Sequence, residues 1–334
     1  METNWKQWEK PLLDLEDTIK KFKELALKAK PEKKEELDEK IRSFEEKRDE
    51  YITKIYGNLS AWEKVLVARA ETRPYTLDYI QTIFTHFTEL DGDRRFSADQ
   101  AIVGGPAFFE GKPVMVIGHQ KGRNIQERQK RNFAMARPEG YRKAIRLMDM
   151  ANRFGLPVIC FIDTPAADPS VGGESRGISE AIAASMLKMF ELEVPVICTV
   201  IGEGGSGGGL GIGVGNIVYM LEHSIYSVIP PEGCAAILWR APEKAPEAAE
   251  ALQLTAQSAK KLKLIDEILP EPFGGAHRNS LEVANTIKAA ISKGLSKLSK
   301  HSANKLKEDR HKKFIKMGNF TEIKEAIIES EPVN

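Results

Sequence analysis

One run of residues dominates this sequence: Gly202-Glu203-Gly204-Gly205-Ser206-Gly207-Gly208-Gly209-Leu210-Gly211-Ile212-Gly213-Val214-Gly215. Nine of its fourteen residues are glycine. The run follows a short apolar segment, 194–201, which predicts a buried β-strand. Because glycine loses more backbone entropy on folding than other residues, this density predicts backbone packed very close to another group. N–H groups at the start of a following helix would favour negative charge there.

A dinucleotide site is one interpretation of this run. Gly202, Gly204 and Gly207 fit the pattern G-x-G-x-x-G after a strand, and Glu222 follows about twenty residues later. However, only about nine residues separate Gly207 from the next apolar segment, 217–221, which leaves little room for the full-length helix of such a fold.

A nucleophile elbow is a second interpretation. Residues 204–208 fit G-x-S-x-G around Ser206, and Asp266 and His277 follow in hydrolase order. Asp266 lies between apolar residues in a pattern typical of a solvent-facing position, and His277 lies in a glycine-rich turn.

We favour a third interpretation, an oxyanion hole built from the backbone N–H groups of Gly204, Gly205, Ser206 and Gly207. Fixed donors stabilise developing negative charge without a side-chain nucleophile, and this interpretation uses every glycine. Ser206 is then expected to be a helix N-cap. A glycine helix that serves packing alone remains the structural alternative.

The overall composition is that of an ordinary globular protein, with 334 residues, 42% hydrophobic residues, 29% charged residues and a net charge of +1. Residues 288–316 contain ten Lys or Arg residues and two acidic residues, so this segment carries 10 − 2 = +8. A solvated basic helix or a surface for an acidic partner is expected here. No basic pattern interleaved with aromatic residues indicates nucleic-acid binding.

The cysteine pattern and the termini indicate a cytoplasmic protein. Cys160, Cys198 and Cys234 form no C-x-x-C pair, so no zinc or other metal site is expected in this chain. Cys160 and Cys198 lie in apolar segments and are expected to be buried. Without a disulfide pattern, apolar leader or run of about eighteen apolar residues, we expect neither secretion nor a membrane span.

Three domains are expected: a helical hairpin over 1–59, an α/β domain over 60–290 and a basic helical tail over 291–334. The hairpin follows from two apolar stripes that Pro31 separates. The stripes consist of Leu12, Leu15, Ile19 and Phe22, then Leu37, Ile41, Phe44, Tyr51 and Ile55. Ser60 and Glu63 form a capping-box pattern at the start of a new helix.

The α/β domain is predicted from strands that alternate with helices. Strands are expected over 100–107, 113–118, 157–163, 195–201, 217–221 and 225–229, with helices over 138–154, 177–192 and after Pro231. The segments 156–163 and 194–201 are alike: each is an apolar strand, followed by a Gly/Pro-rich loop and a helix start. Two such adjacent loops place two backbone donors near one oxygen.

Six segments, taken in order, resemble the alpha subunit family of bacterial acetyl-CoA carboxylase carboxyltransferase. The similarity is specific from about Thr72 to Arg278 and weaker at both ends. The segments are 118–123, 138–144, 161–165, 199–208, 227–235 and 272–278.

The resemblance implies a crotonase-like (Clp protease/crotonase) fold of repeated β-β-α units. It implies transfer of a carboxyl group from N-carboxybiotin, supplied by a biotin carboxyl carrier protein, to acetyl-CoA, giving malonyl-CoA for fatty acid biosynthesis. The implied assembly is an α2β2 heterotetramer with a beta subunit that carries a zinc ribbon, working with a biotin carboxylase in an ATP-dependent complex. No cofactor is expected to be bound by this chain itself.

The second loop of the site is expected to contain Ala166, Ala167, Gly172 and Gly173. Its sequence departs from the family pattern, since residues 165–170 lack two glycines and an aromatic residue. Asp168 would add negative charge near the oxyanion.

One further residue departs from the family pattern, and a group of basic residues is expected to extend the site. Asp91 stands where a histidine is usual in the family. Lys121, Arg123 and Arg131 are expected to form a basic region that contacts CoA or the carrier protein, or a solvated surface.

These departures leave two other functional classes open. One is a non-catalytic paralogue in which the hairpin assembles a complex. The other is an acyl-CoA hydratase or decarboxylase on the same fold, which would not require a biotinylated partner.

Overall fold

The structure is a computed structural model that describes residues 5–318. A seven-stranded sheet lies at its centre, in the order β1-β2-β3-β4-β5-β7, with β6 paired to the end of β4. Only β1 and β2 pair antiparallel, and the other neighbours are parallel. The carboxyl ends of β2, β3 and β4 therefore meet at one edge of the sheet, which is where open α/β sheets bind ligands.

Six of the seven described strands are those that the apolar segments predict, and the short β7 was not predicted. The largest shift is at β4, which continues to Gly205 beyond the expected end at residue 201 because its last residues pair with β6. The strand expected over 225–229 is shorter, because Ser227 and Ile229 close a turn through the Ser227 hydroxyl. In chain order the strands are β1 Ile102–Phe109, β2 Lys112–His119, β3 Val158–Thr164, β4 Val196–Gly205, β5 Ile217–Leu221, β6 Ile225–Ser227 and β7 Glu267–Leu269.

The helices confirm the predicted alternation with strands, and the capping box at Ser60 and Glu63 is present. The α-helices are α1 Trp5–Lys28, α2 Pro31–Tyr56, α3 Ala61–Ala68, α4 Thr76–Ile83, α5 Ile125–Lys130, α6 Pro138–Phe154, α7 Val171–Ser175, α8 Ile178–Glu191, α9 Ser206–Leu210, α10 Pro231–Trp239, α11 Ala245–Ala251, α12 Ala256–Lys261, α13 Ser280–Leu298 and α14 Ala303–Ile315. Two 3₁₀ turns, η1 Asn132–Ala134 and η2 Pro242–Lys244, complete the order. Within residues 5–318, none of these helices has the length and apolarity needed to cross a membrane.

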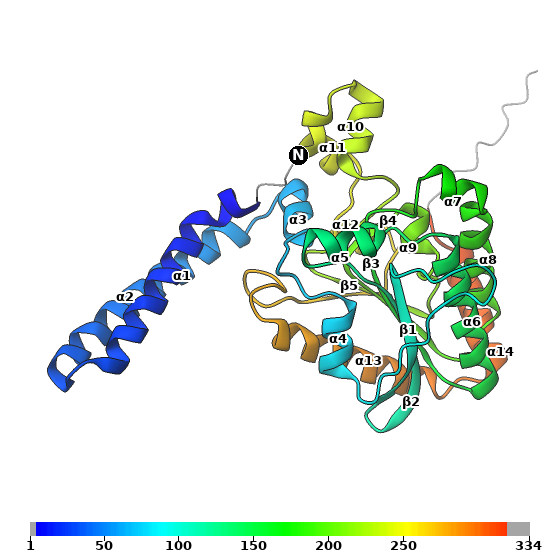
Figure 1. The fold of residues 1–334 in the computed structure, drawn as a ribbon, viewed down its shortest axis with the longest axis horizontal. Helices are drawn as coiled ribbons and strands as arrows, with labels where there is room; N and C mark the ends of the chain where they lie inside the picture. The colour runs from blue at the N-terminus through cyan, green and yellow to red at the C-terminus, as the bar shows by residue number, and fades with distance from the viewer. Residues whose placement is uncertain (1–4, 319–334) are drawn as a thin grey trace, which may run out of the picture.

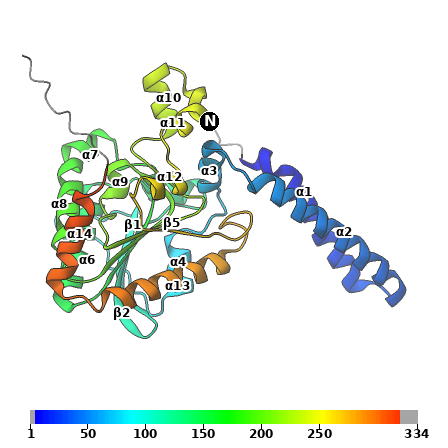
Figure 2. The same cartoon turned by 180° about the vertical axis from the view of Figure 1, so that it is seen from behind.

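The sheet is covered on both faces, as its continuous apolar strands predict. Helices α6, α8 and α14 lie on one side, and α4 and α13 lie on the other (Figures 1 and 2). Alternate residues of each strand enter the two cores: Cys160 and Cys198 face the first, and Ile159 and Ile197 face the second. The predicted burial of Cys160 and Cys198 is confirmed.

The predicted helical hairpin is formed by α1 and α2, and it projects away from the α/β body (Figure 1). Its apolar seam contains buried Ile19 and Ile41 and the flanking residues of the predicted stripes. The assignment of Tyr51 to this seam is wrong, because Tyr51 is exposed and Ile52 is buried. At about 100° per residue, Ile52 lies about 20° from Ile41 around the helix, whereas Tyr51 lies about 80° away.

Buried polar groups join the hairpin to the body. The Glu9 carboxylate of α1 is fully buried. It accepts hydrogen bonds from the Tyr56 hydroxyl and from Arg278 Nη2, the latter at 2.8 Å. Because removing Arg278 would leave the buried Glu9 carboxylate without its cation, this pair holds the base of the hairpin on the loop before α13.

The C-terminal region differs from the basic tail that the sequence predicts. The expected boundary between residues 290 and 291 falls inside α13, and α14 packs on α8 with Leu306 and Arg310 buried. Several of the basic side chains are also neutralised by acidic partners, including Lys307 by Glu193 at 2.9 Å. This segment is part of the fold because α13 spans the expected boundary and α14 buries Leu306 and Arg310. The rest of the expected tail, 319–334, lies outside the described residues.

Arg310 explains why α14 is held so firmly. Its guanidinium group is fully buried and donates to the carbonyl oxygens of Met189, Leu192 and Val194 at 2.6–3.1 Å, and to the Asn216 side chain at 2.6 Å. These carbonyls lie in the last turn of α8 or just beyond it, where backbone acceptors lack helical partners. Burial lowers the pKa of Arg310 to about 10.

We predict that Arg310→Met lowers the free energy of unfolding by about 3–5 kcal/mol, because it strands several buried carbonyl groups at once. Urea unfolding of the full chain measures this change. Lys312→Met, in the same helix but in an exposed pair with Glu308, should leave the free energy of unfolding within error. Equal effects of the two substitutions would show that α14 is a peripheral tail.

Candidate active site

The candidate site lies where β3 and β4 end side by side. The two strands pair regularly up to Ile162 and Val200, and the next pair is Thr164 with Gly204. Two extra residues of β4 are therefore accommodated between these pairs. Such bulges bend a strand and re-aim its side chains, and they are common beside active sites.

The glycine run continues β4 through Gly205 and then turns into the short helix α9. The expectation that Ser206 is an N-cap is wrong. Gly205 holds the cap position, because pairing with β6 keeps the chain extended through that residue. Ser206 is the first residue of α9 and has φ of +49°, a left-handed conformation that costs energy for a residue with a side chain.

Most glycines of the turn are required by close backbone packing. A Cβ at Gly205 would overlap the carbonyl group of Pro165, and a Cβ at Gly208 would lie 2.6 Å from the carbonyl carbon of Ala166. Gly207 is different, since its Cβ would lie 3.4 Å from the Ile182 side chain, an ordinary contact distance. The packing alternative therefore accounts for Gly205 and Gly208, but not for Gly207.

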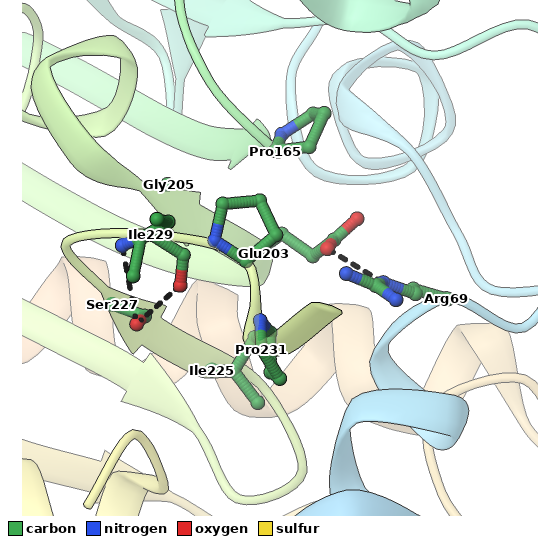
Figure 3. Close-up of a pocket in the computed structure, with 10 residues that line it drawn as sticks. Arg69, Pro165, Glu203, Gly205, Ile225, Ser227, Ile229 and Pro231 are labelled. Atoms are coloured by element: carbon green, nitrogen blue, oxygen red, sulfur yellow. Dashed lines mark hydrogen bonds and ion pairs between the residues drawn. The ribbon is translucent and has the colours of Figure 1, made fainter. Parts of the chain in front are cut away.

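Two hollows flank this turn. A small recess between the end of β4 and the loop before α10 contains Pro165, Glu203, Gly204, Gly205 and Arg69 in its wall (Figure 3). A second, mainly apolar hollow lies on the other side. Its wall contains Ser206, Leu210, Tyr226, Val228, Leu264, Phe314 and Met317. The turn is therefore accessible beside the backbone groups that the sequence singles out.

The loop after β3 lies directly against α9, as the similarity of the two strand–loop–helix units predicts. Neither Ala166 nor Ala167 has a positive φ, so the loss of the usual glycines causes no strain at these positions. Gly172 and Gly173 lie beyond the loop, in α7. Only the Ala166–Ala167 part of the predicted second loop is therefore shown against the turn.

The two departures in charge have local partners. The Asp168 carboxylate accepts a hydrogen bond from the Ser170 hydroxyl at 2.8 Å and lies 3.8 Å from Arg137 Nε. Its charge is therefore bound by local partners at the start of α7. Asp91 accepts from Lys143 Nζ at 2.8 Å, and the Lys143 side chain is fully buried. Asp91 therefore neutralises a buried ammonium group, a role that a neutral histidine would not fill.

Lys121, Arg123 and Arg131 do not form the single basic region that the sequence predicts. Arg123 stacks on Tyr75 at 4.0 Å and pairs with Asp78. Arg131 donates to the Gln100 carbonyl at 2.9 Å. Lys121 points inward and is only 15% exposed, so the expectation of a surface lysine is wrong.

Lys121 belongs to an ionic network at the carboxyl ends of three neighbouring strands. Its Nζ lies 2.7 Å from Asp163 Oδ1 and 3.0 Å from Glu203 Oε2. Arg69 Nε lies 2.8 Å from Glu203 Oε1, and Arg69 Nη1 lies 2.5 Å from Glu232 Oε1. Charged residues directly after apolar strands were the signal in the sequence, but only the fold brings them together.

Burial and pairing oppose each other in this network. Burial raises the pKa of Glu203, but Lys121 and Arg69 outweigh it and bring the pKa to about 2. For Lys121, burial lowers the pKa, and the two carboxylates raise it above its ordinary value. Burial raises the pKa of Asp163 even though Lys121 opposes the shift. Glu203 and Lys121 are thus both charged at neutral pH.

His119 is a buried titratable group that the sequence reasoning missed. It ends β2, is fully buried, and has no hydrogen-bond partner on either ring nitrogen. Burial and the nearby Lys121 lower its pKa to about 3, against a smaller opposite effect of the Gly208 backbone. The imidazole is therefore neutral under α9.

Neither of the first two interpretations of the glycine run survives. Asp266 accepts from the Val218 N–H at 2.7 Å and pairs with Lys313, whereas His277 lies near Glu9 at the hairpin base. These positions do not form a triad with Ser206. The dinucleotide interpretation fails because α9 spans only Ser206–Leu210.

Solved structures with a similar fold are carboxylases and decarboxylases that act on CoA esters or malonate. The beta subunit of geranyl-CoA carboxylase from P. aeruginosa superposes with a TM-score of 0.54 at 15% identity, over 74% of this chain and 46% of that chain. A Pseudomonas malonate decarboxylase hetero-tetramer in complex with coenzyme A gives 0.53 at 16% identity, over 64% and 85%. The fold is that of the crotonase-like carboxyltransferases.

Sequence comparison defines the family. A family model described as acetyl co-enzyme A carboxylase carboxyltransferase-like matches residues 5–318. Acetyl-coenzyme A carboxylase carboxyl transferase subunit alpha of Vibrio parahaemolyticus is 52% identical over 318 residues, and that of Colwellia psychrerythraea is 53% identical over 319. Each match covers 95% of this chain and 99% of the relative. The chain belongs to the family of acetyl-CoA carboxylase carboxyltransferase alpha subunits, and the matched residues 5–318 include the hairpin and α14.

We predict that Gly208→Ala and Gly207→Ala differ strongly in stability. Gly208→Ala forces its Cβ into the Ala166–Ala167 backbone and should lower the melting temperature by about 4 °C or more, as about 1–3 kcal/mol of overpacking implies. Gly207→Ala should stay within about 2 °C of the wild type, since its Cβ meets only Ile182 at contact distance. Differential scanning calorimetry of the two variants tests the distinction, and similar melting temperatures would contradict it.

We also predict that His119 makes the fold sensitive to mild acid. Its pKa is about 3 in the folded chain, against an ordinary value of 6.5 once it is exposed on unfolding. The unfolded chain therefore binds a proton first, and stability falls as the pH drops from 6.5 towards 3. A difference of one bound proton between the unfolded and folded chains changes the free energy of unfolding by about 1.4 kcal/mol per pH unit. His119→Leu should remove this pH dependence. Between pH 6.5 and 5, its free energy of unfolding should therefore rise by about 2 kcal/mol relative to that of the wild type.

Urea unfolding at pH 7.5, 6.5 and 5.0 measures this difference. Glu203 contributes little to the comparison, because its lowered pKa makes its stabilisation disappear only below about pH 4.5. Parallel pH profiles of His119→Leu and the wild type would show that His119 is protonated at no cost in the folded chain.

Proposed function

We propose that this chain transfers the carboxyl group of N-carboxybiotin to acetyl-CoA, giving malonyl-CoA, as the alpha half of a carboxyltransferase. The observation that carries this proposal is identity above one half to named alpha subunits over nearly their whole length. The glycine turn beside the Ala166–Ala167 loop supports it, because the turn offers backbone donors without a side-chain nucleophile.

The chemistry requires two developing negative charges to be stabilised. One forms on the ureido oxygen of biotin as the carboxyl group leaves, and the other forms on the thioester oxygen as acetyl-CoA becomes an enolate. We assign the N–H groups of Gly204, Gly205, Ser206 and Gly207 to the ureido oxygen, with help from the Ala166–Ala167 loop. Loss of one such donor typically costs about 3–4 kcal/mol in other enzymes.

No side-chain base is needed in this scheme. The biotin nitrogen released by carboxyl transfer is itself able to accept a methyl proton of acetyl-CoA. The carboxylates nearest the turn are unsuited to that role, because Glu203 is bound by Lys121 and Arg69. In the proposed function the chain therefore binds, orients and stabilises charge, and the substrate carries the proton.

The proposed partners complete the site. We infer an α2β2 assembly with a beta subunit that supplies the zinc ribbon and most of the acetyl-CoA site, served by a biotin carboxyl carrier protein and a biotin carboxylase. The three cysteines here are unpaired thiols, which suits a reducing cytoplasm. The projecting hairpin is our candidate for an assembly contact.

The sequence departures no longer favour a non-catalytic paralogue. It rested on the altered loop and on Asp91, and both have local physical explanations: Asp168 is bound by Ser170, and Asp91 neutralises Lys143. A decarboxylase or hydratase would act without biotin, so biotin dependence separates that class from ours.

We predict that the isolated chain is inactive and that it catalyses biotin-dependent decarboxylation of malonyl-CoA only with a beta subunit. The reason is that one chain provides one set of oxyanion donors. The assay is coupled detection of acetyl-CoA, with and without biotin. Full activity of the purified chain alone, or activity independent of biotin, would overturn the proposed function.

Within that complex, Gly207→Val should remove at least about 99% of the activity while the chain stays folded and assembled, since its branched side chain stands where the ureido oxygen approaches. Ser206→Ala is the matched control in the same turn, and it should keep substantial activity because the proposed donor is its backbone N–H. Melting temperature and partner binding are measured on the same preparations. A folded, assembled Gly207→Val complex with near-normal activity would exclude a substrate at this position.

A further inference from the structure

We propose that Lys121 is a positioning residue for carboxyl transfer: its ammonium group bridges Asp163 and Glu203 and so fixes the loop after β3 relative to the glycine turn after β4. The inference builds on the proposed function, because it concerns the same turn. It replaces the expectation that Lys121 contacts CoA or the carrier protein.

The bridge lies where the bulge interrupts the regular pairing of β3 and β4. Regular pairing of β3 and β4 stops after Ile162 and Val200, and it resumes only at Thr164 and Gly204. Asp163 lies in this interruption and is 1% exposed. Since backbone pairing is interrupted between these two pairs, side chains supply the contacts that join the strands there.

The Asp163 side chain replaces part of the backbone hydrogen bonding that the bulge removes between β3 and β4. Its Oδ1 accepts a hydrogen bond from the Glu203 N–H at 2.9 Å. The residue before, Gly202, has no side chain, and a Cβ there would lie 2.8 Å from the Asp163 carboxyl carbon. The carboxylate of β3 thus fills the space that the bulge opens and holds the backbone of β4 directly.

Lys121 joins a further strand, β2, to Asp163 and Glu203. It follows β2, which is parallel to β3, and its Nζ reaches Asp163 and Glu203 at 2.7 and 3.0 Å. One ammonium group therefore links the ends of β2, β3 and β4. Gly204 and Gly205 follow Glu203 directly, so a shift of Glu203 moves the proposed donors.

Arg69 extends the bridge outward. It binds the other oxygen of Glu203 and also the Glu232 carboxylate of α10, and Figure 3 shows Glu203 and Arg69 pointing toward each other beside Pro165. Glu203 is thereby held from both sides, between the cation that follows α3 and the cation that follows β2. A carboxylate with both oxygens bound has little freedom to rotate.

Substrate contact by Lys121 does not fit these observations. Its ammonium group is mostly buried and already bound by two carboxylates, whereas a phosphate-binding lysine presents a free charge. A role through Glu203 and Asp163 predicts that the loss of Lys121 lowers kcat and leaves KM for malonyl-CoA nearly unchanged, because misplacement of donors by about 1 Å costs as much as about a hundredfold in rate.

The test uses Lys121→Met in the assembled complex, with Lys143→Met as the matched control. Lys143 is also a buried lysine paired with one carboxylate, Asp91, but it lies on α6, outside the turn. We expect kcat to fall at least tenfold for Lys121→Met with KM within twofold, and kcat of Lys143→Met to stay within about threefold of the wild type. Melting temperatures are measured alongside, because both substitutions leave a carboxylate without its cation.

A second readout does not depend on activity. Hydrogen exchange of peptides from segment 199–210 should become at least tenfold faster in Lys121→Met and stay unchanged in Lys143→Met, because only the first loosens the end of β4. If the wild-type complex proved to have no carboxyltransferase activity while this exchange pattern held, the proposed function would fail and the bridge would stand.

A double variant covers the case in which Lys121→Met does not fold. Lys121→Met with Asp163→Asn removes one charge of each sign, and the asparagine oxygen still accepts from the Glu203 N–H. We expect it to fold with near wild-type melting temperature and yet to keep a kcat at least tenfold below the wild type, since no ammonium joins the strand ends. Wild-type kcat and exchange in either variant, or a tenfold rise in KM with unchanged kcat, would overturn the proposal.

Discussion

The backbone of the turn after β4 lies directly on the backbone of the loop after β3, and this contact dictates what surrounds it. Gly205 meets the Pro165 carbonyl, and Gly208 meets the peptide between Ala166 and Ala167. No side chain fits between surfaces this close, so glycine is required on one of them. The short α9 helix and the strain at Ser206 are found at that approach.

Charge performs a complementary task at the same edge. Where the bulge interrupts the pairing of β3 and β4, a lysine, two carboxylates and an arginine replace the missing backbone contacts. Buried ion pairs contribute little net stability against apolar packing, but they specify geometry because an unpaired member is very costly. The fixed backbone donors that we propose for this site would need geometry more than additional stability.

The same principle recurs away from the site. Arg310 fixes α14 on the carbonyls after α8, Lys143 is buried against Asp91, and Glu9 fixes the hairpin base on Arg278. Arg310 and Glu9 thus tie α14 and the hairpin to the sheet domain, and Lys143 joins α6 to the loop before β1. The result is a sheet domain with a projecting hairpin (Figure 2).

Local patterns in the chain were sufficient for every described strand except β7, for the longer helices, for most of the hairpin seam and for the glycine turn, because periodicity and glycine density report which faces are buried and where backbone approaches backbone. They were not sufficient for Lys121, which looks like a surface lysine until β2, β3 and β4 align, nor for Arg310, whose burial depends on α14 meeting the end of α8. The roles of Ser206 and Tyr51 were also mistaken, the first because β6 extends β4 and the second because a narrow stripe leaves its edge undefined. Hydrophobic pattern is a property of neighbours along the chain, whereas the pairing of buried charges depends on residues that only the tertiary fold brings within 3 Å of one another.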